Sequence, residues 1–396
     1  MSSESVGLRR SRSATGTVAS RPRAIVAVLL ALLALGLGVA APAGAADREF
    51  APRFSVNDTG DIDIFGNTSM TCPTLAIGCT IAQQAGVSTL ADSTSQNNNY
   101  NMQFVDVDGD ASTFNSSRAT VSVPSGSTIL FAGLYWGGRA VGATGFNQRG
   151  TVKFRAPGAT GYTSLTATTL DDGGVAGATD SIYQGFVDVT SRVQAGGPGV
   201  YTVADVQAAT GADKLAGWSL VVAYRNTSQP ARSLTVFDGL RSIGSGATGT
   251  IGISGFTTPP AGSVNTRVGF VNYEGDGGII GDSASLNSTV LSDAQHPATN
   301  FFNSRSSRDG VRRTGQDPSY PNQLGIEQSI LLANNVLANN ATSATVRLTS
   351  SGDVYAPGVV TFATELYAPK VEQTKTFVDV NGGDVEQGDV LRYTIT

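Results

Sequence analysis

From residue 47 onward, apolar residues occur in short clusters of β-branched and aromatic side chains, each bounded by Gly, Pro, Asn, Asp or Ser. This pattern is typical of strands joined by turns, because an amphipathic helix would repeat its apolar positions every three to four residues. It predicts strands at residues 120–123, 128–136, 150–154, 182–189, 199–205, 218–224, 234–237, 250–256, 267–273, 344–348 and 359–366. We therefore expect an all-β protein.

Several predicted strands, such as SLVVAY at 219–224, are apolar on both faces. Strands of this kind are covered on both sides, which predicts a large, jelly-roll-like β-sandwich. Helix is expected only in short pieces, at 191–194 and 327–334.

The segment YAPK at 367–370 interrupts the strand pattern, which resumes at 371–378 and 390–395 around the turn-rich NGGD of 381–384. We therefore expect one β-sandwich module at 46–366 and the first strands of a second domain at 370–396. Two strands cannot bury a core on their own, so this second domain is expected to continue beyond Thr396.

The N-terminal segment has the three parts of an export signal. Residues 1–23 are basic, residues 24–40 are an uninterrupted apolar run, and Ala43-Gly44-Ala45 fits a cleavage site. The segment 1–45 is therefore predicted to be a Sec-type signal peptide of a secreted or cell-surface protein, with an uncleaved membrane anchor as the alternative. In the oxidising environment that follows, Cys72 and Cys79 are predicted to form a disulfide, with two free buried thiols as the alternative.

The composition narrows the possible chemistry. Charged residues make up 14% of the chain, and its formal charge is -5, of which residues 1–45 contribute +4, leaving -9 on the remainder. Such an acidic chain repels phosphates, so no nucleic-acid partner is expected. The single histidine, His296, excludes zinc sites built from several histidines and most histidine-dependent hydrolases.

Two stretches resemble known families. The segment KVEQTKTFVDVNGGDVEQGDVLRYTIT at 370–396, with Lys-Thr on its first strand and Gly-Asp before Tyr-Thr-Ile-Thr, resembles a conserved-repeat domain of unknown function found in tandem on secreted bacterial surface proteins. The preceding region, including NNNYNMQFVDVDGDASTFNSSRATVSVPSGSTILFAGLYWGG and LAGWSLVVAYRN, resembles the N-terminal module that often precedes such repeats in exported, largely actinobacterial proteins. The resemblance implies surface exposure and an Ig-like repeat, and it supplies no catalytic residues.

Three carboxylates at alternate positions, Asp106, Asp108 and Asp110, are the candidate calcium ligands. The EF-hand pattern fails, because Ala111 stands at its glycine position and Ser117 at its bidentate acid. The alternative is a strand with these aspartates facing water. Residues Asp58, Asp61 and Asp63 form a similar, weaker set, with a solvated strand edge as the alternative.

Enzyme signals are weak. Ser283 of a Gly-Asp-Ser triplet and His296 of an Asp-x-x-His block superficially resemble the lipase and esterase blocks, but they lie close together among turns. Carboxylates for glycoside cleavage are available at Glu274 with Asp276 or Asp282, where solvated loop acids are the alternative. The GSGATG of 244–249 matches G-x-G-x-x-G, but a predicted strand follows it, so we interpret it as a turn.

Two further features invite a binding or crosslinking role. Strand alternation places Lys375 on the same face as Val371 and Phe377, where it could form an isopeptide bond; the alternative is a lysine that reaches the sheet edge. Five aromatic residues could offer a sugar-stacking surface, although core positions suit them better. They are Phe131, Tyr135, Trp136, Trp218 and Tyr224.

These observations predict a secreted or cell-surface structural or adhesion-type protein without catalytic activity, with the C-terminal repeat serving as a stalk. The expected partner is an extracellular protein, a glycan or the cell envelope, and no small-molecule substrate is expected. A calcium- or carbohydrate-binding module is the first alternative, with calcium as the only cofactor considered. An extracellular hydrolase using Ser283 and His296 is the remote one.

Overall fold

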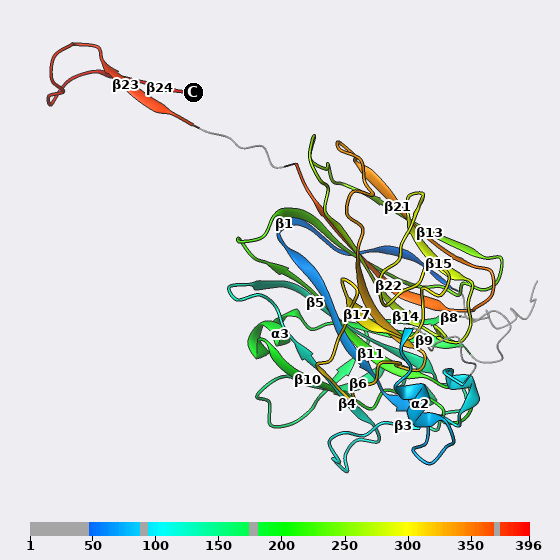
Figure 1. Ribbon diagram of the computed structural model, residues 1–396. Helices are drawn as coiled ribbons and strands as arrows, with labels where there is room; N and C mark the ends of the chain where they lie inside the picture. Colours follow the sequence, from blue (N-terminus) through cyan, green and yellow to red (C-terminus); the bar gives the residue numbers. More distant parts are fainter. Residues whose placement is uncertain (1–46, 88–93, 174–180, 368–372) are drawn as a thin grey trace, which may run out of the picture. The chain divides into compact units, whose positions relative to one another are not determined.

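The computed structural model describes residues 47–87, 94–173, 181–367 and 373–396 (Figure 1). Strands dominate these residues, and the all-β prediction is confirmed. The predicted signal peptide at 1–45 lies outside the described residues, as does most of the predicted boundary at 367–370. Among the described residues, no helix is long and apolar enough to cross a membrane.

The strands form three large sheets and two small ones. The largest has the order β18 (Val311–Arg312), β17 (Ser306–Arg308), β20 (Ile326–Leu332), β14 (Thr266–Tyr273), β22 (Ala356–Glu365), β12 (Ala231–Leu240), β1 (Arg48–Thr68), β11 (Ala216–Arg225), β5 (Thr128–Arg139), β9 (Ile182–Asp188) and β8 (Thr169–Gly173). A second has the order β19 (Gln316–Asp317), β4 (Ser116–Val121), β10 (Gly199–Ala204), β6 (Thr151–Arg155) and β7 (Thr163–Thr166). The third is β13 (Thr248–Ser254), β21 (Ser343–Ser350), β15 (Asp282–Leu286) and β16 (Thr289–Val290).

Short elements complete the described chain. The pairs β2 (Met70–Thr71) with β3 (Gln103–Phe104) and β23 (Lys375–Asp379) with β24 (Leu391–Ile395) are the two small sheets. The helices are α2 (Cys79–Gln83) and α3 (Thr190–Gly196), together with the 3-10 turns η2 (Asn97–Asn99) and η3 (Phe146–Gln148).

The long strand β1 divides the largest sheet into two halves. Its residues up to Thr59 pair with β12, whereas Gly60 to Thr68 pair with β11. At the change of partner, Gly60 has φ +145°, and a Cβ built there would lie 1.9 Å from the carbonyl oxygen of Tyr224. Only glycine tolerates both this backbone conformation and this close approach, so Gly60 fixes the point where the strand changes partner.

Among the described residues, three hydrophobic cores lie between the layers of sheet. Alternation along β11 sends Leu220 and Val222 into a core shared with the five-stranded sheet, and sends Val221 and Ala223 into a second core. This second core also contains side chains of β12, β14, β20 and β22, so the two halves of the largest sheet face each other. The third core joins the four-stranded sheet to the other side of β14 and β22. The sandwich is therefore a stack of layers, and buried strands with two apolar faces are its inner layers.

The structure confirms one local prediction and differs from the prediction at two places. The helix expected at 191–194 is present as α3, but the one expected at 327–334 is wrong, because this segment lies almost entirely within β20. There it is hydrogen-bonded to β14 on one side and β17 on the other, and this pairing overrides the helix preference of its residues. The sequence pattern also missed β1.

Candidate functional site

Two adjoining hollows form a polar groove beside the bend of β1. One, of about 320 Å³, is lined by Phe65, Gly66, Ala119, Thr120, Ser122, Arg308, Val311, Arg312, Arg313, Thr314, Gly315 and Gln316. The other, of about 520 Å³, is lined by Asp61, Asp63, Ser122, Val123, Pro124, Tyr224, Gln229, Arg232, Arg267 and Arg308. They share Ser122 and Arg308. We call the pair the arginine groove, since five arginines and only two carboxylates line it.

Two elements far apart in the sequence place the charged side chains. Immediately after Gly60, β1 brings in Asp61 and Asp63, which are only 2% and 6% exposed. The hairpin of β17 and β18 contributes Arg308 and Arg312, and its two-residue Asp-Gly turn has positive φ at both positions. This is the turn geometry that joins antiparallel strands most tightly.

The carboxylate of Asp61 is shared among guanidinium groups. Its Oδ2 lies 2.9 Å from Nη2 of Arg308, 3.1 Å from Nη1 of Arg267 and 3.7 Å from Nη1 of Arg232. Asp309 and Glu365 neutralise the outer sides of Arg267 and Arg232. Burial lowers the pKa of Arg308, but Asp63 and Asp61 raise that pKa by more, so the Arg308 guanidinium remains charged at neutral pH. The aspartates are therefore held inside the protein as ion-pair partners, and the alternative of a solvated strand edge is wrong for Asp61 and Asp63.

A second carboxylate, Asp63, holds the outer arginines. It lies 3.0 Å from Nη1 of Arg308 and is hydrogen-bonded to Nη2 of Arg313. The Arg313 guanidinium also lies 4.8 Å above the centre of the Phe65 ring. Burial lowers the pKa of Arg313 in spite of Asp63, and burial lowers the pKa of Arg312 as well. The positive charges of Arg312 and Arg313 are thus less completely offset by carboxylates than the charge of Arg308.

Three residues that line the smaller hollow have polar side-chain atoms that are buried without a hydrogen-bond partner in the described part of the chain. They are Nε of Arg312, Nε of Arg313 and Oε1 of Gln316. Gln316 is only 8% exposed, and its Nε2 donates to the carbonyl of Gly66 at 2.9 Å, which leaves Oε1 as a fixed acceptor. These three atoms have almost no accessible surface, so they belong to the packed wall of the hollow and are uncompensated there.

The residues of the hydrolase hypothesis are not brought together. His296 is fully buried, its Nδ1 is 2.9 Å from the Phe301 carbonyl, and its Nε2 is 2.8 Å from Oγ of Ser307 instead of Ser283. Burial lowers the pKa of His296, which favours the neutral ring. Glu327, at 3.7 Å from Nδ1, is also fully buried. A serine, a histidine and a glutamate therefore do meet here, but they are enclosed in the core.

The carboxylates considered for glycoside cleavage are buried rather than solvated. Glu274 and Asp276 are 5% and 3% exposed, and Asp282 is fully buried. Burial raises the pKa of Glu274 and of Asp276, while Arg139 opposes both shifts. The Arg139 guanidinium is 3.2 Å from Glu274 and also binds Asp213. This cluster lines neither hollow of the arginine groove, and the alternative of solvated loop acids is wrong.

The three candidate calcium ligands are engaged in hydrogen bonds and an ion pair within the protein. Asp106 accepts a hydrogen bond from Ser116 at 2.7 Å, and Asp108 accepts one from Tyr162. Asp108 also lies 3.4 Å from Arg155, and Oδ1 of Asp110 accepts the backbone N–H of Ser112. In the described ranges no group of three or more acidic, histidine or cysteine side chains is arranged to hold a metal ion. The contacts around Asp106, Asp108 and Asp110 thus give the calcium hypothesis no support.

The structure also places Lys375 and the five aromatic residues considered as a sugar-stacking surface. Lys375 is exposed, and its Nζ lies 4.1 Å above the ring of Tyr393 within the β23–β24 hairpin. An isopeptide bond at this lysine stays a prediction. The five aromatic residues considered as a sugar platform are all at most 4% exposed, so they do not form an exposed stacking surface, although Tyr224 lines the larger hollow of the arginine groove.

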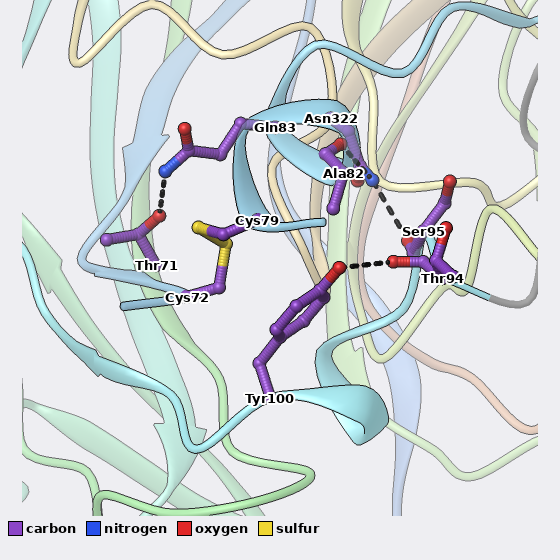
Figure 2. The surroundings of a disulfide bond; sticks show 9 residues. All are labelled: Thr71, Cys72, Cys79, Ala82, Gln83, Thr94, Ser95, Tyr100 and Asn322. Atoms are coloured by element: carbon purple, nitrogen blue, oxygen red, sulfur yellow. Dashed lines mark hydrogen bonds between the residues drawn. A yellow bond between two sulfur atoms is a disulfide. The ribbon is translucent and has the colours of Figure 1, made fainter. Parts of the chain in front are cut away.

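Cys72 and Cys79 form the predicted disulfide. Figure 2 shows it beside α2, where Gln83 donates to the Thr71 hydroxyl at 2.8 Å. Asn322, from a distant part of the chain, donates to the carbonyls of Ala82 and Ser95 (Figure 2). The disulfide closes the segment between residues 72 and 79, and the Asn322 amide ties this segment to the body of the protein.

Comparison with known families assigns the chain to one of them. A family model described as a protein of unknown function, DUF3344, matches residues 82–365, which is well over half of the sequence. The chain belongs to this family. The match covers β3 to β22 and therefore includes the arginines of the groove, whereas Asp61 and Asp63 on β1 precede it. No curated protein matches the chain.

Two solved structures show faint similarity. One is described as the STIV MCP, with 10% identity over 63% of this chain and 92% of that one, and a TM-score of 0.17. The other is the major capsid protein P2 from bacteriophage PM2, with 11% identity over 64% of this chain and 98% of that one, and a TM-score of 0.17. At such TM-scores, neither similarity supports a conclusion about this family.

Sequence reasoning missed the arginine groove. Its strongest signal was the stretch RSSRDGVRR at 305–313, which places four arginines within nine residues of an otherwise acidic chain. The Asp-Gly pair inside it predicts a tight hairpin, and so two neighbouring strands carrying cations. That Arg308 and Arg313 contact the DTGDID segment of β1 could not be read from spacing, because Arg308 and Asp61 are 247 residues apart.

Proposed function

We propose that this chain is an exported, non-catalytic surface module that attaches to a component outside the cell through the arginine groove, with residues 370–396 beginning a stalk. The observation that carries the proposal is the groove itself. It is a polar hollow whose wall carries five arginines and only two carboxylates. Concave sites with a few convergent polar groups are the usual form of ligand-binding sites.

Export is supported by two independent features. The N-terminal residues have the basic, apolar and small-residue parts of a signal peptide. The disulfide between Cys72 and Cys79 is of a kind that persists mainly in oxidising compartments. A stack of β-layers with three cores also suits a durable extracellular module.

The absence of catalysis is proposed because the available chemistry is enclosed. The single histidine has no exposed surface, and both of its ring nitrogens are engaged. A general base must reach its substrate within hydrogen-bond distance, which a fully buried ring does not do.

Between the two binding alternatives, the groove favours a carbohydrate over calcium.

The proposal is tested by binding to envelope material. The full chain, purified after export from its producing host, would be incubated with washed envelope fragments of that host, together with Arg312→Gln and Arg192→Gln variants. Arg312 lines the groove, whereas Arg192 is an exposed arginine of α3 outside it. We expect saturable binding that Arg312→Gln weakens and Arg192→Gln leaves unchanged.

Two results would contradict the proposal. Absence of saturable binding to envelope material by the unmodified chain would remove the attachment role. Turnover of ester or glycoside substrates that disappears in Ser283→Ala or Asp276→Asn, with melting temperatures preserved, would remove the non-catalytic part.

A further inference from the structure

The segment closed by the disulfide exposes a cluster of large apolar side chains. Leu75 is 97% exposed and Ile77 is 99% exposed, and Ile81, on α2, is 66% exposed. We call these three residues the apolar tip. Single exposed aliphatic residues are ordinary on protein surfaces, but a group of large ones on one short segment marks a place of interaction.

This segment directs its large apolar side chains outward and its small ones inward. Ala76, between Leu75 and Ile77, packs against the core shared with the five-stranded sheet, and the buried residues of α2 are Cys79 and Ala82. Folding alone favours the reverse arrangement, because burying a larger aliphatic side chain removes more apolar surface from water. The exposure of the apolar tip therefore points to a contact outside the chain.

The backbone beneath the apolar tip is held in one conformation before any contact is made. The disulfide between Cys72 and Cys79 closes the loop (Figure 2). Inside it, the N–H of Ala76 donates to the carbonyl of Pro73 at 2.8 Å, and the N–H of Cys79 donates to the carbonyl of Ala76 at 3.1 Å. A preorganised loop loses little conformational freedom on binding, so more of the free energy of burying its side chains is retained as affinity.

No charged residue interrupts the sequence around the apolar tip. Between Asp63 and Asp92 the chain contains no Asp, Glu, Lys, Arg or His. Moving a charge out of water is costly unless it is paired, so a segment without charges enters apolar surroundings at a much lower cost. The lack of cations also means that attraction to anionic groups does not contribute to such a contact.

The size of the apolar tip favours a lipid surface over a protein partner. Three aliphatic side chains offer roughly 200–400 Å² of apolar surface. A stable protein–protein interface takes about 800 Å² from each partner. A bilayer needs no matching surface, because apolar side chains that enter the boundary between headgroups and acyl chains are sufficient for reversible binding.

We infer that the apolar tip binds the chain reversibly to a lipid bilayer, with Leu75, Ile77 and Ile81 inserted at the boundary between headgroups and acyl chains. This inference goes beyond the proposed function, because it concerns a surface separate from the arginine groove. The formal charge of -9 outside residues 1–45 does not assist binding to anionic lipid. The binding is therefore apolar in origin and insensitive to salt.

The test is co-sedimentation of the full chain, purified after export, with two kinds of vesicle. One is phosphatidylcholine alone, and the other is phosphatidylcholine mixed with phosphatidylglycerol. We expect salt-independent binding to the first and equal or weaker binding to the second. Leu75→Ser and Ile77→Ser should each weaken it about tenfold or more, because an inserted aliphatic side chain is lost. Ile280→Ser, at a 62% exposed isoleucine outside the apolar tip, is the matched control and should leave binding unchanged.

Insertion is measured directly with an Ile77→Trp variant. The two natural tryptophans, Trp136 and Trp218, are 0% and 1% exposed, so a vesicle-dependent blue shift of the emission reports the new side chain. We expect this shift with phosphatidylcholine vesicles. Melting temperatures of all variants establish that they are folded.

The inference is overturned if the unmodified chain binds neither vesicle, if it binds only vesicles that contain phosphatidylglycerol, or if the folded double variant Leu75→Ser with Ile77→Ser binds like the unmodified chain. The last outcome would assign the binding to another part of the chain, such as the apolar run at 24–40. A dimer that depends on Leu75 and Ile77 and forms without vesicle binding would overturn it in favour of a second copy of this chain. None of these outcomes affects binding through the arginine groove, which is tested separately.

Discussion

The buried carboxyl group of Asp282 should make the stability of this protein depend on pH. Its side chain is fully buried, its Oδ1 accepts the backbone N–H of Phe302 at 2.6 Å, and its Oδ2 has no partner among the described residues. Burial raises the pKa of Asp282 from 3.8 to about 7, although the backbone N–H groups of Phe302 and Phe301 oppose the shift. The folded state therefore retains a proton that the unfolded chain has already released.

The direction and size of the effect follow from linkage. Because the folded pKa is the higher one, the stabilisation is complete below about pH 3.8 and is lost as the pH rises through 7. Each pH unit over which only the folded state is protonated costs about 1.4 kcal/mol. Between pH 5 and 8 the folded state holds the extra proton over roughly two such units, so Asp282 alone lowers the free energy of unfolding by about 2–3 kcal/mol.

Urea unfolding at pH 5, 6, 7 and 8 measures this slope. The unmodified protein should lose stability steadily as the pH rises, and Asp353, whose pKa burial raises to about 8, should add to the loss. Asp282→Asn keeps the acceptor for Phe302 and removes the titration, so its slope should be shallower by about 2–3 kcal/mol over this range. Asp384→Asn, at an exposed carboxylate of the β23–β24 loop, is the matched control. A folded Asp282→Asn variant with an unchanged slope would refute the reasoning.

Three further predictions test the bend, the ion pairs and the calcium hypothesis. Gly60→Ala should lower the free energy of unfolding by about 3 kcal/mol, because the added Cβ would overlap the β11 backbone. The control Gly252→Ala on β13 should be neutral, because its Cβ would meet no atom within 4 Å. Equal effects of the two substitutions in denaturant unfolding would contradict this prediction. Asp61→Asn should cost about 3 kcal/mol in the same assay by leaving Arg308 and its neighbours without their shared carboxylate, and an unchanged midpoint would be inconsistent with it. A chelator should leave the melting temperature unchanged, since the 106–110 segment uses its carboxylates in internal hydrogen bonds; a chelator-dependent decrease would restore the calcium site.

Much of the fold could be predicted because strand alternation is a local property. The segment SLVVAY, apolar on both faces, was predicted as a strand covered on both sides, and it lies in β11 between two cores. The segment EQSILLAN was mistaken for a helix because Glu, Gln, Leu and Ala are good helix formers. Its strand conformation is fixed by β14 and β17, and neither partner can be recognised within the segment itself.

The site could be predicted less well because it depends on pairs that are remote in sequence. Residues 48–68 contain Pro52, Gly60 and several charged residues, all of which weaken a strand prediction. Their polarity is explained only by arginines that come from β12, β14 and β17. Asp61 and Asp63 had been noticed as carboxylates, but without those partners the sequence favoured solvent or calcium over a buried ion-pair network.

The bend of β1 connects this architecture to the proposed recognition. A strand that leaves one half of a sheet for the other must pass a point where its neighbours separate, and at Gly60 the partner changes from β12 to β11. The two aspartates that follow are buried at this point, which is tolerable only if cations accompany them. The β17–β18 hairpin and the segment after it supply more guanidinium groups than these carboxylates neutralise, because Arg312 has only Ser319 as its partner among the described residues. An ion-pair network that stabilises the bend thus also leaves a guanidinium group at its rim, that of Arg312, which no carboxylate of the described residues neutralises.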